Sequence, residues 1–118
     1  MADIEEKIAR HESLILELLQ ECQTGYQEYP WGNIEDILVA DKERRHYQLI
    51  ATGWRKSKHL HNILMHFHIR PDGKIWVEAN NTEVEVAREL LEKGVQKSDI
   101  VLAFHTENVR PMTGYAVA

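Results

Sequence analysis

Four β-prone runs separated by short turn sequences constrain the fold more than any other feature of this sequence. They cover residues 34–40, 46–54, 60–69 and 74–79. The last turn contains Pro71-Asp72-Gly73, in which proline presets φ and glycine accepts a positive φ. Strands joined by such short connections pair with their neighbours in the chain. The sequence therefore predicts a four-stranded antiparallel meander.

The alternation of apolar and polar residues predicts which side of the meander is buried. Successive side chains of a strand point to opposite faces, so Met65 and Phe67 share one face with the apolar residues of matching register on the other strands. His59 and His61 have the same parity and are predicted at the start of this core face. The predicted core face comprises Tyr47, Leu49, Ala51, Ile63, Met65, Phe67, Ile69, Ile75 and Val77.

Two helices are predicted to flank the strands. Apolar residues at three- and four-residue spacing indicate a helix over residues 3–22, with Asp3 as its N-cap. The second helix is predicted to open at Thr82, which fits a capping box with Glu85. Gly94 fits the position just beyond the end of that helix, where a positive φ is common.

The remaining segments complete a single α+β domain over residues 1–118. Residues 24–33 contain glycine and proline and are predicted to be a loop. Residues 99–104 are predicted to be a strand or extended segment, with a short helix capped by Ser98 as the alternative, and residues 113–117 to be a last short strand. The predicted order is an N-terminal helix, the four-stranded antiparallel meander, a second helix and a C-terminal extended segment.

Charge and composition argue against some classes of protein. The net charge is -5, with -7 in residues 1–40, +5 in residues 41–74 and -3 in residues 75–118. An acidic chain is a poor autonomous DNA binder, because non-specific affinity comes from phosphate neutralisation. The single Cys22 allows no disulfide within the chain and fits a cytoplasmic, reducing environment. No signal peptide or run of about 20 apolar residues is seen, so a soluble protein without a membrane span is expected.

Polar residues of the opposite strand face form the first candidate site. The predicted register places His46 near His68 and His66 near Glu78. Three imidazoles and a carboxylate on neighbouring strands are able to hold zinc, which would suit a metal-binding or hydrolytic domain. No CxxC or HExxH pattern accompanies them. We therefore interpret the group as a polar sheet face or interface, and expect neither a metal nor another cofactor.

A basic hairpin tip is the second candidate site. Arg55, Lys56 and Lys58 lie between the second and third predicted strands. Such a run is usually a solvated turn, and the alternative is a contact with an acidic partner or a phosphate. No nucleophile motif or phosphate-binding motif is present, so the chain is not expected to be an enzyme.

Several segments, in this order and spacing, resemble the XisI family of fdxN element excision controlling factors. The family is typical of cyanobacteria and is associated with excision of a DNA element during heterocyst differentiation. The resemblance implies an α+β fold and a regulatory, non-catalytic role. The segments that carry it are HYQLIATGW (46–54), DGKIWVE (72–78), NTEVEVARELLEKGVQKSDIVLAFH (81–105) and RPMTGYAVA (110–118).

The resemblance also implies partners. XisI-type factors act alongside a companion protein called XisH, while a separate site-specific recombinase performs strand exchange. We therefore expect an XisH-like protein as the partner, with the recombinase as a further candidate and no direct nucleic-acid binding. From the residues alone, an exposed sheet edge would also permit a homodimer.

Overall fold

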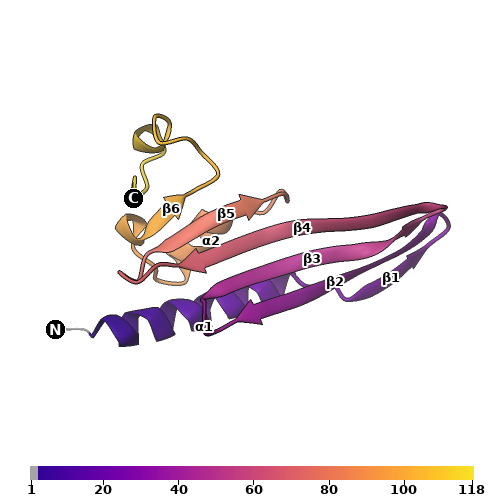
Figure 1. Ribbon diagram of the computed structural model, residues 1–118, viewed down its shortest axis with the longest axis horizontal. Coiled ribbons are helices and arrows are strands. Elements are labelled where there is room, and N and C mark those ends of the chain that lie inside the picture. Colours follow the sequence, from indigo (N-terminus) through magenta and orange to yellow (C-terminus); the bar gives the residue numbers. More distant parts are fainter. Residues whose placement is uncertain (1–2) are drawn as a thin grey trace.

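The computed structural model describes residues 3–118, which form two α-helices, two 3₁₀ helices and one six-stranded sheet (Figure 1). The predicted α+β class is confirmed, and the sheet is larger than expected. In chain order the elements are α1 (Ile4–Cys22), β1 (Tyr26–Tyr29), β2 (Gly32–Asp41), β3 (His46–Arg55), β4 (Lys58–Ile69), β5 (Ile75–Asn80), α2 (Val86–Glu92), a 3₁₀ helix (Lys97–Asp99), β6 (Ile100–Leu102) and a 3₁₀ helix (Arg110–Met112).

The sheet follows chain order from β1 to β6. Neighbouring strands are antiparallel except β5 and β6, which are parallel. The predicted meander corresponds to β2–β5, but the prediction of a loop over residues 24–33 was wrong. Tyr26–Tyr29 pairs with β2. Of the residues that indicated a loop, Gly25 precedes β1, Pro30 lies in the hairpin turn and Gly32 begins β2.

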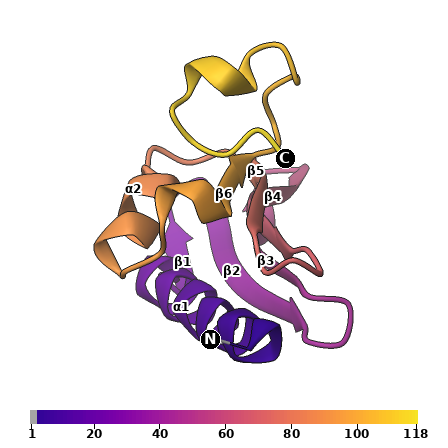
Figure 2. The ribbon, with the colours of Figure 1, turned by 90° about the vertical axis from the view of Figure 1, so that its left-hand side faces the viewer.

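Both helices pack on one face of the sheet, which we call the inner face (Figures 1 and 2). The buried core lies between this face and the helices. The hydroxyl of Tyr47 on β3 donates a hydrogen bond to Glu12 of α1, and the Nδ1 of His11 donates to the Gly73 carbonyl at 2.7 Å. These bonds join α1 to the sheet. The largest fully buried side chains include Ile15, Leu18, Leu19, Tyr47, Leu49, Met65, Phe67, Ile69, Ile75, Leu90 and Ile100.

A β-bulge at Leu64 overturns part of the predicted face assignment. Leu49 pairs with Met65, but the next residue, Ile50, pairs with Ile63, so Leu64 is an extra residue in β4. The extra residue reverses the parity of β4 on its N-terminal side. Ile63, predicted to be in the core, is therefore 39% exposed.

The same bulge moves two histidines. His61 pairs with Thr52 and His59 with Trp54, and these partners lie on the face opposite the helices, which we call the outer face. The prediction that His59 and His61 lie on the core face was wrong, because simple alternation does not detect an inserted residue. All four histidines of β4 share the outer face.

The second helix starts later than predicted. It begins at Val86, and its N-cap residue Glu85 makes no side-chain capping hydrogen bond. The proposed capping box was wrong because the Thr82 hydroxyl donates to Asn80 and accepts from the Val84 amide, which closes a turn instead. Gly94 does follow the helix with φ +100°, as expected.

The C-terminal segment is mostly irregular. The strand predicted over residues 99–104 is confirmed in part, since β6 covers Ile100–Leu102. The alternative of a helix capped by Ser98 was wrong, because the 3₁₀ helix at Lys97–Asp99 precedes the strand and has Gln96 as its N-cap. The strand predicted over residues 113–117 is reduced, within the described chain, to a parallel bridge between Val101 and Ala116. Arg110 holds this region through its guanidinium, which donates to carbonyls of the same segment.

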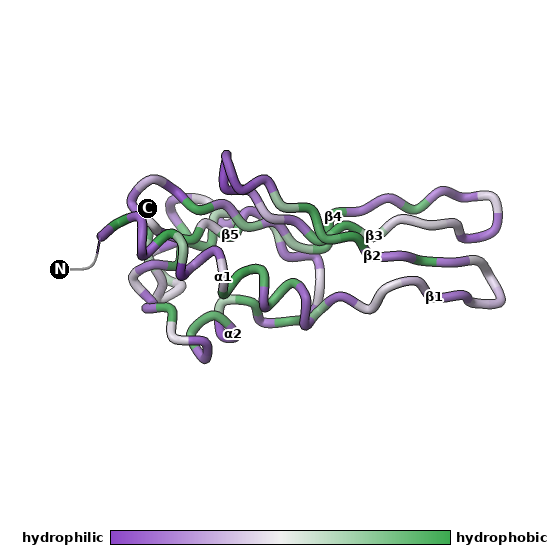
Figure 3. Tube along the Cα trace, turned by 90° about the horizontal axis from the view of Figure 1, so that it is seen from below, coloured by the Kyte–Doolittle hydropathy of each residue, from purple (hydrophilic) through white to green (hydrophobic). Residues whose placement is uncertain are grey.

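The sheet extends well beyond α1, so the molecule is elongated, with extents of 53 × 30 × 24 Å. We call the extended part, residues 26–35 and 51–62, the distal arm. At its base Asp36, which is buried, accepts hydrogen bonds from the amides of Thr24 and Gly25, where the chain leaves α1. Hydrophobic stretches gather in the middle of β2–β4, and the arm is mostly hydrophilic (Figure 3).

Candidate functional site

The first candidate site is a cluster of three imidazoles on the outer face, His46, His66 and His68. His46 pairs with His68 across β3 and β4, as predicted, and their rings stack with centroids 3.9 Å apart. The Nδ1 of His46 lies 2.9 Å from the Nε2 of His66, a hydrogen bond in which one nitrogen donates and the other accepts. His46 and His66 therefore hydrogen-bond to each other rather than to a hydroxyl or a thiol.

Two of the three imidazoles, those of His66 and His68, resist protonation. Burial lowers the pKa of both His66 and His68, and the neighbouring His46 ring lowers them further. The carboxylate of Glu78 opposes both shifts. Burial therefore favours the neutral form of the His66 and His68 rings.

The fourth predicted member, Glu78, does not pair with His66 across β4 and β5 as predicted. A second bulge makes it the extra residue of β5, so that His66 pairs with Ala79 instead. No ion pair joins it to a histidine in the part of the chain that the structure describes. Within residues 3–118, no three histidine, cysteine or acidic side chains are arranged to hold a metal ion. The geometry thus gives no support to the metal-binding alternative.

A second histidine pair lies further along β4. His59 packs against Trp54 with ring centroids 4.7 Å apart, and His61 has its Nδ1 3.4 Å from the Thr52 hydroxyl. Ile63 separates this pair from the imidazole cluster. The four histidines therefore follow one strand face without sharing a centre.

The predicted basic tip is present at the end of the distal arm. Arg55 ends β3 and Lys58 begins β4, with Lys56 in the turn at φ 55°. All three are exposed. The Arg55 guanidinium lies 5.6 Å from the centre of the Trp31 ring, which in turn stacks on Tyr29. The tip thus combines cations with aromatic rings in an arrangement able to contact an anionic surface.

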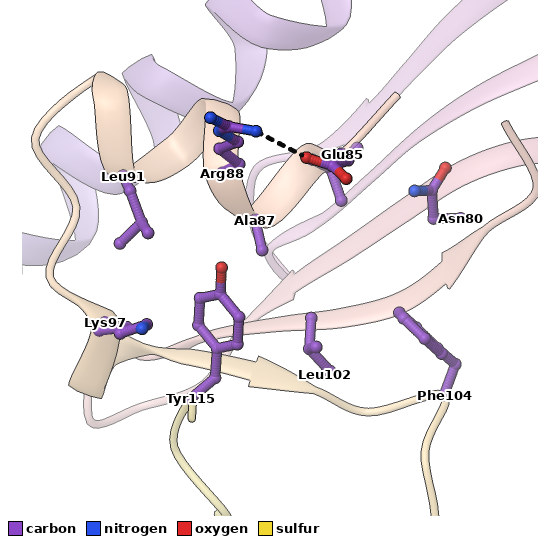
Figure 4. A pocket seen from close by; sticks show the side chains of 10 residues that line it. Asn80, Glu85, Ala87, Arg88, Leu91, Lys97, Leu102, Phe104 and Tyr115 are labelled. Carbon is purple, nitrogen blue, oxygen red and sulfur yellow. Dashed lines mark hydrogen bonds and ion pairs between the residues drawn. The ribbon is translucent and has the colours of Figure 1, made fainter. Parts of the chain in front are cut away.

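A pocket between α2 and β6 was not predicted. Its volume of about 450 Å³ lies within the range of small-ligand and side-chain sites. Figure 4 shows Tyr115 standing between the two elements, with its hydroxyl directed toward α2. The Lys97 ammonium lies 5.4 Å from the centre of that ring. The lining residues are Asn80, Glu85, Val86, Ala87, Arg88, Leu91, Lys97, Leu102, Phe104 and Tyr115.

The pocket suits an apolar group that carries a negative charge. Leu91, Leu102 and Phe104 supply apolar walls, and Lys97 supplies a cation beside them. Phe104 is 49% exposed, so the apolar surface continues to the rim. Sequence reasoning missed this site because it joins α2, β6 and the C-terminal segment, which only the folded chain brings together.

A family model described as XisI protein matches residues 5–117, nearly the whole chain. The chain belongs to the XisI family. The resemblance inferred from the sequence is therefore confirmed. Among curated proteins, none matches this chain.

Two solved structures of XisI-type proteins from Anabaena variabilis are similar to the chain. An XisI-like protein is 33% identical, with a TM-score of 0.82, and the match covers 94% of this chain and 99% of that one. The fdxN element excision controlling factor XisI is 28% identical, with a TM-score of 0.78, and the match covers 95% and 99%. Both share the α+β fold. In the described range, no helix is long and apolar enough to cross a membrane.

Proposed function

We propose that this XisI-family chain is a non-catalytic accessory factor that controls excision of a DNA element by binding a protein partner. The observation that carries the proposal is the match, over nearly the full length of both chains, to a protein described as an fdxN element excision controlling factor. The expected partner is an XisH-like protein, and a site-specific recombinase would perform the strand exchange.

The chemistry of the chain supports a binding role rather than a catalytic one. The imidazoles of His46 and His66 bond to each other. Burial raises the pKa of the Cys22 thiol, which disfavours the reactive thiolate. The overall charge of -5 supports an indirect route to DNA, through another protein.

The pocket beside α2 is the surface that we assign to the partner. It is concave and apolar with a cation at its edge, which suits an apolar side chain next to an acidic one. An exposed aromatic residue such as Phe104 is typical of the residues that dominate binding energy at interfaces.

Co-purification with an XisH-like protein tests the proposal. We expect a complex at about micromolar concentration, and we expect F104D to weaken it because a charge would replace the aromatic rim. M112D is the matched control, because Met112 is 82% exposed in the same C-terminal region and does not line the pocket. The proposal would be overturned if no complex formed and an excision reporter gave the same signal with and without the chain.

A gel-shift experiment separates indirect from direct action on DNA. The chain alone is expected to give no salt-dependent shift, although Arg55, Lys56 and Lys58 supply a local basic tip. A shift by the chain alone that disappears in K56E would show direct contact and contradict the partner-mediated route.

A further inference from the structure

The outer face of the sheet carries an ordered set of residues that neither the pocket nor the basic tip uses. Strands β2, β3 and β4 pair in register, so their outer residues form rows that run across the sheet. The central row is Ile37, Ile50 and Ile63, three isoleucines directly opposite one another. Ile37 and Ile63 are 41% and 39% exposed. Such a row on an open face is typical of an interaction surface.

The rows on both sides of the isoleucines end in a histidine on β4. The next row on one side is Glu35, Thr52 and His61; on the other side Val39, Gln48 and His66 come first, followed by Asp41, His46 and His68. The β2 side of the face therefore carries two acids, its centre is apolar, and its β4 side carries imidazoles. Both helices lie on the other side of the sheet (Figure 2).

We propose that this outer face binds the same face of a second copy of the chain, with a twofold axis running along β3. This axis places β2 of one copy over β4 of the other. Each row of one copy then lies opposite the same row of the second copy in reversed strand order. Glu35 therefore faces His61 of the second copy, and Ile37 faces its Ile63. Ile50 meets Ile50 on the axis. A self-complementary surface of this kind is what an isologous dimer requires.

The arrangement of charges selects this axis. A twofold axis at right angles to the strands would place β2 over β2 and bring the carboxylates of Glu35 and Asp41 toward those of the second copy. Like charges facing each other oppose association. An axis along the strands instead puts each carboxylate opposite an imidazole N–H that can donate to it. It also brings both basic tips to the same end of the dimer.

The size of the face is sufficient for a dimer. Strands β2–β4, of ten to twelve residues each, offer with their neighbours roughly 33 Å by 19 Å in plan. That is about 600 Å² before side-chain relief is counted, near the ~800 Å² per partner of a standard interface. Two sheets packed face to face with nearly aligned strands form a common and stable arrangement.

The oligomeric state of the full chain in solution tests the proposal. Sedimentation of the wild type is expected to give twice the monomer mass of 13.8 kDa. I50E is expected to weaken the dimer by at least ~100-fold, because two carboxylates would meet on the axis. N62E is the matched control, since Asn62 is an exposed neighbour on β4 that pairs with Ala51 and points to the inner face.

A pair of charge-changing variants tests the dimer contact in a way that a folding defect cannot imitate. E35K and H61E are each expected to weaken the dimer, and the E35K/H61E double variant is expected to restore it. Within one copy the two positions are separated by Thr52, so rescue has to arise between copies. A wild type that stays monomeric up to about 100 µM would overturn the proposal, as would a dimer that survives I50E. If the wild type were monomeric and I50E lost binding to the XisH-like partner, the outer face would be assigned to that partner instead.

Discussion

The two faces of the sheet use the same strands in different ways. On the inner face, Tyr47 and Phe67 are completely buried beneath the helices. On the outer face, Ile37, Val39 and Ile63 are apolar and about two-fifths exposed. Apolar residues therefore occur on both faces, and the position of the helices decides which of them stabilise the monomer. Alternation along a strand therefore identifies the two sides of a sheet but not what covers each side.

The largest expected effect comes from the inner face. Phe67 has no exposed surface and packs in the core beneath the helices. F67A removes this buried ring and leaves a cavity, so we expect the free energy of unfolding to fall by about 3–5 kcal/mol. Chemical denaturation at low protein concentration measures the change. A loss below about 1 kcal/mol would mean that the helices do not seal this face.

Asp36 at the base of the distal arm is the next test. Its carboxylate accepts hydrogen bonds from the Thr24 and Gly25 amides and from the Thr24 hydroxyl. D36A leaves these donors without their acceptor, so we expect a loss of about 2–3 kcal/mol in the free energy of unfolding. E35A, measured at a protein concentration where the chain is monomeric, is the control, since Glu35 is exposed on the outer face. Equal losses in both variants would show that the carboxylate does not anchor the arm.

The histidines of the two faces also make the stability of the protein depend on pH. His11 lies beneath the inner face with 1% of its surface exposed, and burial lowers its pKa despite the opposing Gly73 carbonyl and Asp99 carboxylate. The unfolded chain takes up a proton near pH 6.5, where the folded imidazole remains neutral. Unfolding is therefore favoured by acid, and stability is complete above about pH 6.5 and declines as the pH falls below it.

Variants separate the contributions of the two faces to this pH dependence. H11Q is expected to be less stable than the wild type at pH 8 and to lose less stability between pH 8 and pH 5. H68Q is expected to flatten the profile less, because His68 is only partly buried and solvent screens its charge. Denaturation midpoints measured across this pH range provide the test. A steeper acid loss in H11Q would contradict the assignment.

Local signals in the sequence predicted most of the inner face and little of the outer one. The alternation around Met65 and Phe67 and the Pro71-Asp72-Gly73 turn identified the central strands and their buried side, because these features are short in range. The bulge at Leu64 was not predicted, since it depends on Asn81, whose amide and side chain donate to the carbonyls of Leu64 and Ile63.

The candidate sites also divide into those that a local sequence pattern predicts and those that only the folded chain assembles. The pairing of His46 with His68 and the basic tip were predictable because each needs only one hairpin. The pocket needs α2, β6 and Tyr115 together, and the isoleucine row needs three strands in register after the bulge. Contacts between segments that are distant in the sequence produce no local periodicity from which they could be predicted.

The smallest expected effect is on the outer face. Ile63 is partly exposed and meets Ile50 across β3 and β4. I63T keeps a β-branched side chain that suits a strand, and it removes apolar surface that water already reaches in the monomer. We expect the free energy of unfolding of the monomer to change by less than about 1 kcal/mol, measured by denaturation at a protein concentration where the chain is monomeric. If I63T destabilised the monomer as strongly as F67A, the outer face would belong to the core, and the distinction between the two faces would fail. If its cost instead grew with protein concentration, the stabilising contact would be one made between copies.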